Sequence, residues 1–460
     1  MPNETAAAVW QQGDGTAAAC PRISSPEKMP GWDQAIKLLV PAGLAVLLVF
    51  ALRFGSLSAY WQLFSAKTYA HLLPALAAAY SLALLLFQAL RTILWLRYKP
   101  YPPAEGRLPP LTVIIPAYNE GAMVQQAIDA VLAADYPAEK LEIICIDDGS
   151  TDDTWSYIHR ACRQYPGRLT PIRFRGNRGK KEALYAGFTR GRGEVYATID
   201  SDSIIDRAAL RHLVAPLLAE PRIGAVAGNV KVFNRHQSLM GKMQAVRFVN
   251  LDYLRASQSL YRAVICTPGS LSAYRRAALR PILEAWRRQT FLGAPCRHSE
   301  DRALTNFILG GGHYTYYQRT AVVHTLVPET YRGVCRMYLR WERGNVREAC
   351  RQLRYLFTKY RPKYRLMPIV EFFLTGLEFP FTFLFFGLLI TSVICYPAIL
   401  FKLLIALGIM SLVNLGYYLR LERSWDFVYG VVYSYFAFFT LQWIYPYAFF
   451  TVRDTRWLTR

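Results

Sequence analysis

Apolar residues in this chain of 460 residues are gathered into long blocks near both ends, with a mixed region between them. Two blocks near the start span residues 36–52 and 70–96, and three near the end span residues 372–396, 398–419 and 427–452. The first two blocks are long enough to cross a hydrocarbon core about 30 Å thick. The pattern therefore predicts membrane helices on both sides of a soluble domain, with buried core helices as the alternative.

The first hundred residues divide into a tail and two predicted spans. Residues 1–30 are polar and rich in small residues, without the regions of a cleavable signal peptide, and we interpret them as a flexible tail. Residues 31–100 are predicted to form two transmembrane helices. Arg91, Arg97 and Lys99 close the second apolar block, which favours a cytoplasmic position for the region after residue 100.

The C-terminal region, residues 367–460, is predicted to form further transmembrane helices whose topology stays open. Three spans that start in the cytoplasm place the tail 453–460 outside, whereas its three arginines favour the inside. The block 427–452 contains Pro446 and also fits two short or re-entrant segments. Glu371 and Glu378 lie near the start of the first block, where carboxylates either line a polar path or stay at the interface.

Residues 101–330 have the pattern of a soluble α/β domain. Strands are predicted at 111–116, 142–147, 170–174 and 194–200, and helices at 121–134, 151–165 and 181–190. This alternation predicts a mostly parallel sheet. Ligands of such sheets bind at the carboxyl ends of the strands. Two acidic clusters, at 147–148 and 200–202, stand at predicted strand ends.

Residues 331–366 combine nine arginines and two lysines with two glutamates and many aromatic residues. Beside membrane spans, such a segment predicts amphipathic helices on the inner leaflet, with an ordinary solvated helix as the alternative. The net charge of the whole chain, +22, is compatible with nucleic acid, anionic lipid or a phosphorylated substrate. Its concentration beside the spans favours the membrane and weakens the case for nucleic acid.

The eight cysteines form no Cys-x-x-Cys pair, so neither a zinc site nor a redox motif is predicted. Most of them lie in the predicted soluble region, which indicates a reducing compartment.

Three segments at predicted strand ends carry the candidate chemistry. They are VIIPAYNE at 113–120, ICIDDGSTD at 144–152 and ATIDSDS at 197–203. Their order and strand context resemble those of glycosyltransferase family 2. The resemblance implies a GT-A type domain that binds a nucleotide sugar, flanked by transmembrane and interfacial helices.

The donor site can be assigned from these segments. Asp200 and Asp202 offer the hard oxygen ligands that Mg²⁺ or Mn²⁺ requires beside a diphosphate leaving group. Asp148 can accept hydrogen bonds from ribose or uracil, and Tyr118 can stack on the base. Glu120, in the same family-like segment as Tyr118, is expected in the same donor site. Helix capping or turn formation is the alternative for each single aspartate.

A glycine-rich loop, RGNRGKKEAL at 175–184, leads into a predicted helix. Its glycines and lysines suit contact with phosphate. The loop resembles the Asn-x-Gly-Lys segment of the family, which makes Lys180 a candidate donor contact. A plain solvated loop is the alternative.

Two later segments resemble the branch of hyaluronan synthases and rhizobial chitooligosaccharide synthases. In CTPGSLSAYRR at 266–276, Gly269-Ser270-Leu271 replaces the Gly-Pro-Leu of that branch, and Ser270 is expected beside the acceptor sugar. The best local match to that branch is formed by two segments, QTFLG at 289–293 and SEDRALTN at 299–306. The resemblance implies Asp301 as catalytic base with Glu300 beside it, where neighbouring carboxylates can raise each other's pKa. An exposed acidic helix N-terminus is the alternative.

Arg340-Trp341 resembles the end of the Gln-x-x-Arg-Trp motif of processive synthases, with Met337 in the place of Gln. The resemblance implies that Arg340 holds the diphosphate and that Trp341 stacks on the acceptor sugar. An interfacial pair on an amphipathic helix is the alternative.

The resemblance covers most of the chain from residue 111 onward. It implies a processive, inverting synthase in the inner (plasma) membrane, with a cytoplasmic catalytic domain, that makes and translocates a β-linked polysaccharide. The expected partners are a UDP-sugar, the growing polysaccharide and the lipid bilayer, with no nucleic acid; accessory export subunits stay open. UDP-N-acetylglucosamine, alone or alternating with UDP-glucuronate, is the expected donor.

Three alternatives remain open. The first is a synthase that uses UDP-glucose, and the second is a single transfer to a polyprenyl phosphate, which product size separates from polymerisation. The third is a non-catalytic protein that uses the fold for binding, which a UDP-release assay separates.

Overall fold

The computed structural model describes residues 31–54, 72–376, 390, 393–394 and 398–454. Among these residues, eight strands form one mixed sheet in the order β3-β2-β1-β4-β7-β6-β10-β5, and two more form a small hairpin. The strands are β1 (Leu111–Ala117), β2 (Leu141–Asp147), β3 (Leu169–Arg173), β4 (Val195–Ile199), β5 (Ser203–Ile205), β6 (Ile223–Val232), β7 (Leu271–Arg275), β8 (Thr290–Phe291), β9 (Ala294–Pro295) and β10 (Tyr314–Thr325).

The strands predicted from the sequence are the parallel part of this sheet. β1 pairs in parallel with β2 and β4, and β2 with β3. β7 runs antiparallel between β4 and β6, whereas β10 lies parallel to β6 and antiparallel to β5. The predicted α/β class with a mostly parallel sheet is confirmed.

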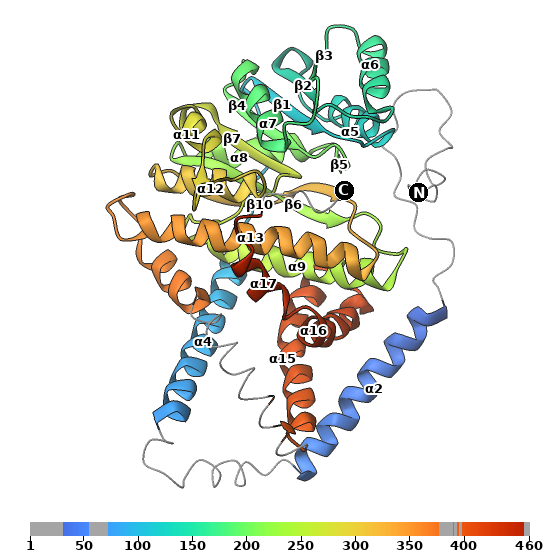
Figure 1. Cartoon of the computed structure of the whole chain (residues 1–460), viewed down its shortest axis with the longest axis vertical. Helices are drawn as coiled ribbons and strands as arrows, with labels where there is room; N and C mark the ends of the chain where they lie inside the picture. Colours follow the sequence, from blue (N-terminus) through green and yellow to red (C-terminus); the bar gives the residue numbers. More distant parts are fainter. Residues whose placement is uncertain (1–30, 55–71, 377–389, 391–392, 395–397, 455–460) are drawn as a thin grey trace.

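The helices, with bounds as the structure has them, cover the sheet and extend away from it (Figure 1). They are α2 (Gly31–Phe54), α4 (Leu72–Arg97), α5 (Met123–Leu132), α6 (Thr154–Gln164), α7 (Lys180–Arg190), α8 (Ala209–Ala219), α9 (Leu239–Leu260), α10 (Arg276–Leu279), α11 (Leu283–Arg287), α12 (Glu300–Gly310), α13 (Tyr331–Leu356), α15 (Ala398–Glu422), α16 (Val428–Thr440) and α17 (Ile444–Phe450), with short 3₁₀ turns η3 (Ala138–Lys140), η4 (Arg280–Ile282) and η5 (Trp425–Phe427).

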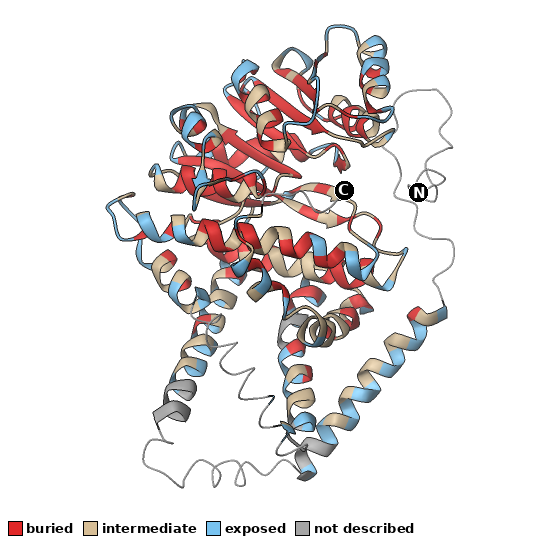
Figure 2. Cartoon of the chain, viewed as in Figure 1, coloured by how far each residue is buried: buried red, intermediate tan, exposed pale blue. Residues whose placement is uncertain are grey.

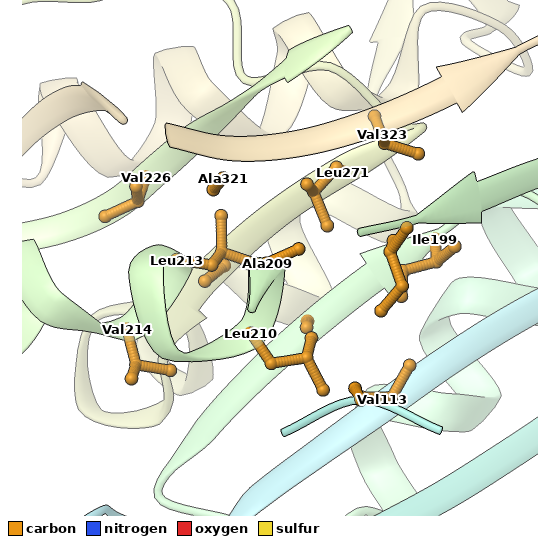
Figure 3. Packing of buried hydrophobic residues seen from close by; sticks show 14 of the residues in the cluster. Val113, Ile199, Ala209, Leu210, Leu213, Val214, Val226, Leu271, Ala321 and Val323 are labelled. Carbon is orange, nitrogen blue, oxygen red and sulfur yellow. The ribbon is translucent and has the colours of Figure 1, made fainter. Parts of the chain in front are cut away.

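Side chains of the sheet alternate between two apolar cores because successive residues of a strand point to opposite faces. Val113 joins the core formed with α5, α6 and α8, whereas Ile114 joins the core formed with α7, α11 and α12. Figure 3 shows the first core, where Leu210 and Leu213 of α8 pack among residues of the central strands. All seven residues of β1 are buried, as expected for a central strand covered on both faces.

Three helices of the described chain are long and apolar enough to cross a membrane. Their apolar stretches are Gly31–Val49, Ala79–Arg97 and Leu403–Glu422. In Figure 1 these helices project away from the sheet, beyond a layer formed by α9 and α13. Figure 2 shows that buried residues gather in the sheet and that the projecting helices carry mainly intermediate and exposed residues. Exposed apolar helices of this length are typical of membrane spans.

The apolar block 427–452 is not one straight helix. It divides into α16 and α17, which are bent by 49° at a short break. The residues after α17 return toward α13, where Asp454 Oδ2 lies 3.1 Å from Arg343 Nη2. This geometry agrees with the two-segment alternative for the block 427–452. The tail 1–30, Glu378 and most of the block 372–396 lie outside the described residues.

Most of the basic segment 331–366 forms one long helix, α13, and one side of this helix packs inside the protein. Val334 and Met337 pack with Ile444 and Ala448 of α17. The guanidinium of Arg343 is buried as well. Exposed apolar or aromatic side chains and exposed basic side chains occur together at both ends of the segment. They are Tyr331 and Arg332 at its start and, toward its end, residues that include Leu353, Arg354, Phe357, Lys359, Arg365 and Leu366.

Glu371 lies in a helical segment that is packed against α4 and the end of α9. Its Oε1 accepts hydrogen bonds from Arg91 Nη2 at 2.5 Å and Gln258 Nε2 at 3.0 Å. Its Oε2 accepts one from the Tyr261 hydroxyl at 2.7 Å. The carboxylate therefore joins α4, α9 and the segment after α13 at the boundary between the projecting helices and the sheet.

Candidate active site

The carboxyl ends of β1 and β2 carry two loops that are tied to each other. β1 and β2 are in register up to the pair Ala117 and Asp147. Thr151 N donates to Asn119 Oδ1 at 2.9 Å, and Glu120 N donates to Thr154 Oγ1 at 2.8 Å. Tyr118 and Glu120 are half-buried at this edge of the sheet. Their contacts with a donor remain predictions.

Asp148 organises the loop that leads into α7. Its carboxylate accepts hydrogen bonds from Arg178 N at 2.7 Å and Gly179 N at 2.8 Å. Burial raises the pKa of Asp148, and these two backbone hydrogen bonds act in the opposite direction. Because the loop is fixed in this way, Lys180 begins α7 at the edge of the sheet where β4 ends. The predicted contact with ribose or uracil remains a prediction.

Lys180 is the central cation of the site. Its Nζ lies 2.5 Å from Asp200 Oδ1 and 3.2 Å from Glu300 Oε1. Burial opposes its positive charge, but the two carboxylates outweigh burial and raise the pKa of Lys180 above its ordinary value. The side chain therefore joins the end of β4 to the start of α12 and stays protonated.

The acidic pair after β4 offers accessible oxygen ligands. The Asp200 side chain is 27% exposed, although one oxygen binds Lys180. Asp202 is half-buried and accepts a hydrogen bond from Ser203 Oγ at 3.2 Å. Within the described ranges, no three His, Cys, Asp or Glu residues form a complete metal cage. Two carboxylates fit Mg²⁺ or Mn²⁺ only where diphosphate and water complete the shell, which is how such sites are usually built.

The predicted base stands at the start of α12. Asp301 Oδ2 accepts a hydrogen bond from Gly269 N at 3.2 Å, and Oδ1 accepts one from Arg302 N at 2.7 Å. Trp286 Nε1 donates to the backbone oxygen of Glu300 at 3.0 Å and fixes the first turn. Ser299, directly before the helix, has a φ of 57°, an unusual value for a residue with a side chain. Such strained positions often occur beside functional groups.

The two neighbouring carboxyls have pKa values shifted in opposite directions. Burial, followed by the negative charge of Glu300, raises the pKa of Asp301, against the attraction of Lys180. For Glu300, burial also acts to raise the pKa, but Lys180 and Arg340 outweigh it and lower the value. Glu300 is therefore the charged partner and Asp301 the better proton acceptor.

Gly269 allows the loop 266–270 to approach the Lys180–Asp200 pair. A Cβ atom at this position would lie 2.8 Å from Lys180 Nζ and 3.6 Å from Asp200 Oδ1. Ser270 is buried beside it. The loop therefore lies between the acidic end of β4 and the base, which is compatible with the predicted acceptor role of Ser270.

Arg340 lies close to the predicted catalytic carboxyls, whereas the described contacts of Trp341 are aromatic. Ser299 Oγ donates to the backbone oxygen of Arg340 at 3.4 Å, and the charge of Arg340 lowers the pKa of Glu300. The Trp341 ring lies 5.5 Å from the ring of Tyr338 and 6.4 Å from that of Phe248, between centroids. Met337 packs in an apolar cluster with α17. The acceptor role of Trp341 remains a prediction.

The structure thus brings together the predicted residues Lys180, Asp200, Glu300 and Asp301, with Arg340 nearby. Sequence reasoning missed the backbone of Gly269, the indole of Trp286, and a group formed by His298, Arg343 and Arg347. A signal for the arginines was present, since residues 340, 343 and 347 are spaced to share one face of a helix. Trp286 had no such signal, because its partner lies in another element.

Comparisons with known proteins agree with this geometry. Residues 112–283 match the family model described as Glycosyl transferase family 2. An N-acetylglucosaminyltransferase of Azorhizobium caulinodans is 31% identical over 362 residues, which cover 76% of this chain and 87% of the relative. A hyaluronan synthase of Streptococcus pyogenes is 30% identical over 377 residues, which cover 78% and 86% of the two chains.

Among solved structures, a mannosyltransferase of Pyrobaculum calidifontis in complex with GDP-Man and Mn²⁺ matches with a TM-score of 0.58 and 25% identity. The match covers 79% of this chain and 96% of the mannosyltransferase.

Proposed function

Because this chain belongs to glycosyltransferase family 2, we propose that it is a processive, inverting enzyme that polymerises a UDP-sugar and passes the product across the membrane. The observation that carries the proposal is the convergence of Lys180 Nζ on Asp200 Oδ1 at 2.5 Å and on Glu300 Oε1 at 3.2 Å, with Asp301 next to Glu300 at the start of α12. This arrangement provides a half-buried carboxylate, that of Asp301, which is suited to accept a proton next to groups that suit a diphosphate.

Asp301 removes the proton from the acceptor hydroxyl in the proposed mechanism. The hydroxyl oxygen attacks the anomeric carbon from the side opposite the diphosphate, so the configuration inverts. A single base at the acceptor side is sufficient for this displacement. The hydrogen bond from Gly269 N keeps one carboxylate oxygen in place, and the second oxygen is held by the first turn of α12.

The departing diphosphate develops negative charge that cationic groups must offset. Lys180 and Arg340 are the candidate side chains for this role. Asp200 and Asp202 are the residues that would hold a divalent cation, which would act there as a Lewis acid on the diphosphate. The Mn²⁺ in the mannosyltransferase complex supports a divalent cation in this fold.

The relatives suggest the sugar. One is named an N-acetylglucosaminyltransferase and the other a hyaluronan synthase. We therefore propose UDP-N-acetylglucosamine as the donor, alone or alternating with UDP-glucuronate. UDP-glucose and a single transfer to a polyprenyl phosphate are the competing functions.

The proposal places α2, α4 and α15 in the plasma membrane and the sheet in the cytoplasm. The exposed apolar surfaces of these helices support this placement. Trp341, on the helix that separates the sheet from the projecting helices, is the proposed stacking platform for the acceptor. Aromatic stacking under a sugar binds without fixing the register, as a processive enzyme requires.

The deciding experiment uses purified full-length protein in detergent with Mg²⁺ or Mn²⁺ and single or paired UDP-sugars. UDP release and product length are measured together. Long product from UDP-N-acetylglucosamine alone, or only from the pair with UDP-glucuronate, supports the proposal and identifies the polymer. Long product from UDP-glucose alone assigns the competing donor. Addition of one sugar to an added polyprenyl phosphate, without polymer, contradicts the processive function.

A further inference from the structure

Residues 451–454, at the C-terminal side of α17, lie against the start of the helix that carries the proposed base. His298 Nε2 lies 3.2 Å from the backbone oxygen of Asp454. Because His298 is followed directly by Ser299 and Glu300, this contact joins the end of the last helix pair to the first turn of α12. It connects two segments that lie 156 residues apart in the sequence.

Arg343 holds the same C-terminal segment from α13. Its side chain is almost fully buried, with the residue only 1% exposed. Nε and Nη2 donate to Thr451 Oγ1 at 3.1 Å and 3.0 Å, and Nη2 lies 3.1 Å from Asp454 Oδ2. A buried guanidinium is stable only where its charge is matched. Asp454 supplies that charge, so Arg343 fixes two residues of the segment at once.

The start of α12 is also held from the side of α13. Arg347 Nη2 donates to the backbone oxygen of His298 at 2.5 Å. A Cβ atom added to Gly344 would overlap the side chain of Ser299, so α13 and Ser299 are in close contact. Since Ser299 has a strained φ of 57°, its conformation depends on these surroundings. Any loosening of them changes the direction in which α12 begins.

His298 contributes a fixed donor. Burial, followed by the charge of Arg347, lowers the pKa of His298 to about 4, so the ring is neutral at neutral pH. A neutral imidazole carries one N–H, and the contact with a carbonyl oxygen assigns that proton to Nε2. The Nε2–H of His298 therefore donates to the backbone oxygen of Asp454, and His298 is always the donor in this contact.

We propose that Asp454 is a positioning residue which, through Arg343 and His298, holds the start of α12 in the orientation that aims Asp301 at the acceptor. Turnover then depends on the seating of α16 and α17 against the catalytic domain. The inference rests on the proposed role of Asp301 as the base. It adds that Asp454, near the C-terminal end of the chain, orients Asp301 through its contacts with Arg343 and His298.

The test compares Asp454→Asn, Asp454→Glu and Arg343→Lys in full-length protein, with Arg453→Ala as matched control. Arg453 is the exposed neighbour of Asp454 in the same segment. We expect Asp454→Asn and Arg343→Lys to lower kcat at least tenfold while KM for the UDP-sugar changes less than twofold. Asp454→Glu should restore much of kcat, because it returns the charge to Arg343. Arg453→Ala should match the wild type.

Two results would overturn the inference. The first is wild-type kcat in Asp454→Asn. The second is an equal loss of UDP-sugar binding, thermal stability and kcat in both Asp454→Asn and Arg343→Lys, which means general unfolding. Asp301→Asn is measured in parallel. Turnover in Asp301→Asn would contradict the assignment of Asp301 as the base. If Asp301→Asn is inactive and Asp454→Asn has normal activity, the base assignment stands and only the positioning role of Asp454 is contradicted.

Discussion

Gly269 N and Asp301 Oδ2 lie 3.2 Å apart and form the hydrogen bond that joins the loop 266–270 to the first turn of α12. The loop also contacts the Lys180–Asp200 pair, since Gly269 leaves room for Lys180 Nζ. One backbone N–H therefore links the proposed acceptor side of the site to its donor side. The orientation of Asp301 depends on this bond as much as on its own helix.

Asp301→Asn is expected to abolish sugar transfer, with a loss on the order of 10²–10⁴-fold, because an amide cannot accept the acceptor proton. Binding of the UDP-sugar should persist, since the variant keeps an oxygen for the bond from Gly269 N. Initial rates of UDP release and calorimetric titration with UDP-sugar measure the two effects. Near-normal turnover would place the base elsewhere.

The rate should fall on the acid side at a pH above 3.8, the ordinary aspartate value, because the pKa of Asp301 is raised by burial and Glu300. A base works only when deprotonated, so activity is present above its pKa and lost as pH falls through it. Glu300→Gln removes the neighbouring negative charge and should move this acid limb to lower pH. A pH–rate profile of both proteins checks the shift. If the acid limb is in the same place in Glu300→Gln, the group that titrates in the profile is not Asp301.

Excess EDTA should stop UDP release, and added Mg²⁺ or Mn²⁺ should restore it. Asp202→Asn should lower turnover by at least tenfold, because it removes a charged oxygen ligand from a site with few protein ligands. Circular dichroism of the variant should match the wild type, since Asp202 is half-buried at a strand end. Full activity in EDTA would contradict metal dependence.

Trp341→Ala should shorten the polymer more than it weakens donor binding, because a stacking platform contacts the product and not the nucleotide. Trp341→Phe keeps an aromatic face and should retain part of the product length. Gel analysis of product size, set against UDP affinity, distinguishes this role from simple packing. If the ring serves only the cluster with Phe248 and Tyr338, product length and donor affinity should fall together.

The stability of the protein should decrease as pH falls from about 6.5 to about 4, in part because of His298. Its ordinary pKa of 6.5 applies in the unfolded chain, and burial lowers it to about 4 in the fold. Between these pH values the His298 imidazole is protonated in the unfolded state but not in the folded state. This difference lowers the free energy of unfolding by up to about 3 kcal/mol. His298→Gln keeps a side-chain N–H and should flatten this dependence in thermal melts at stepped pH. A slope equal to that of the wild type would exclude His298 as a contributor.

Local patterns were sufficient to predict the first half of the sheet, because β1, β2 and β4 are short apolar runs and the first three predicted strands each lead to a predicted helix. β7 could not be placed in the same way. Its position between β4 and β6 depends on pairing partners tens of residues away, such as Ile199 with Leu271.

The site was predictable to the extent that its residues stand in recognisable motifs at strand ends. Lys180, Asp200, Glu300 and Asp301 lie together. Asp200 follows the carboxyl end of β4, where ligands of such sheets bind, whereas Lys180 begins α7 and Glu300 and Asp301 begin α12. Asp148 shows where this reasoning stops. The sequence indicates that it accepts hydrogen bonds but cannot reveal that Arg178 and Gly179 already donate to it.

The break between α16 and α17 has a practical consequence for experiments in cells. Asp33, near the start of α2, pairs with Lys242 of α9, and Asp454 returns to Arg343 of α13. With α2 and α4 crossing the bilayer as proposed, both ends of the described chain face the compartment of the sheet. Fluorescent reporters inserted before residue 31 and after residue 454 should therefore both be quenched by a quencher that is on the same side of the membrane as the sheet. A protease added to the outside of intact cells should cleave neither reporter.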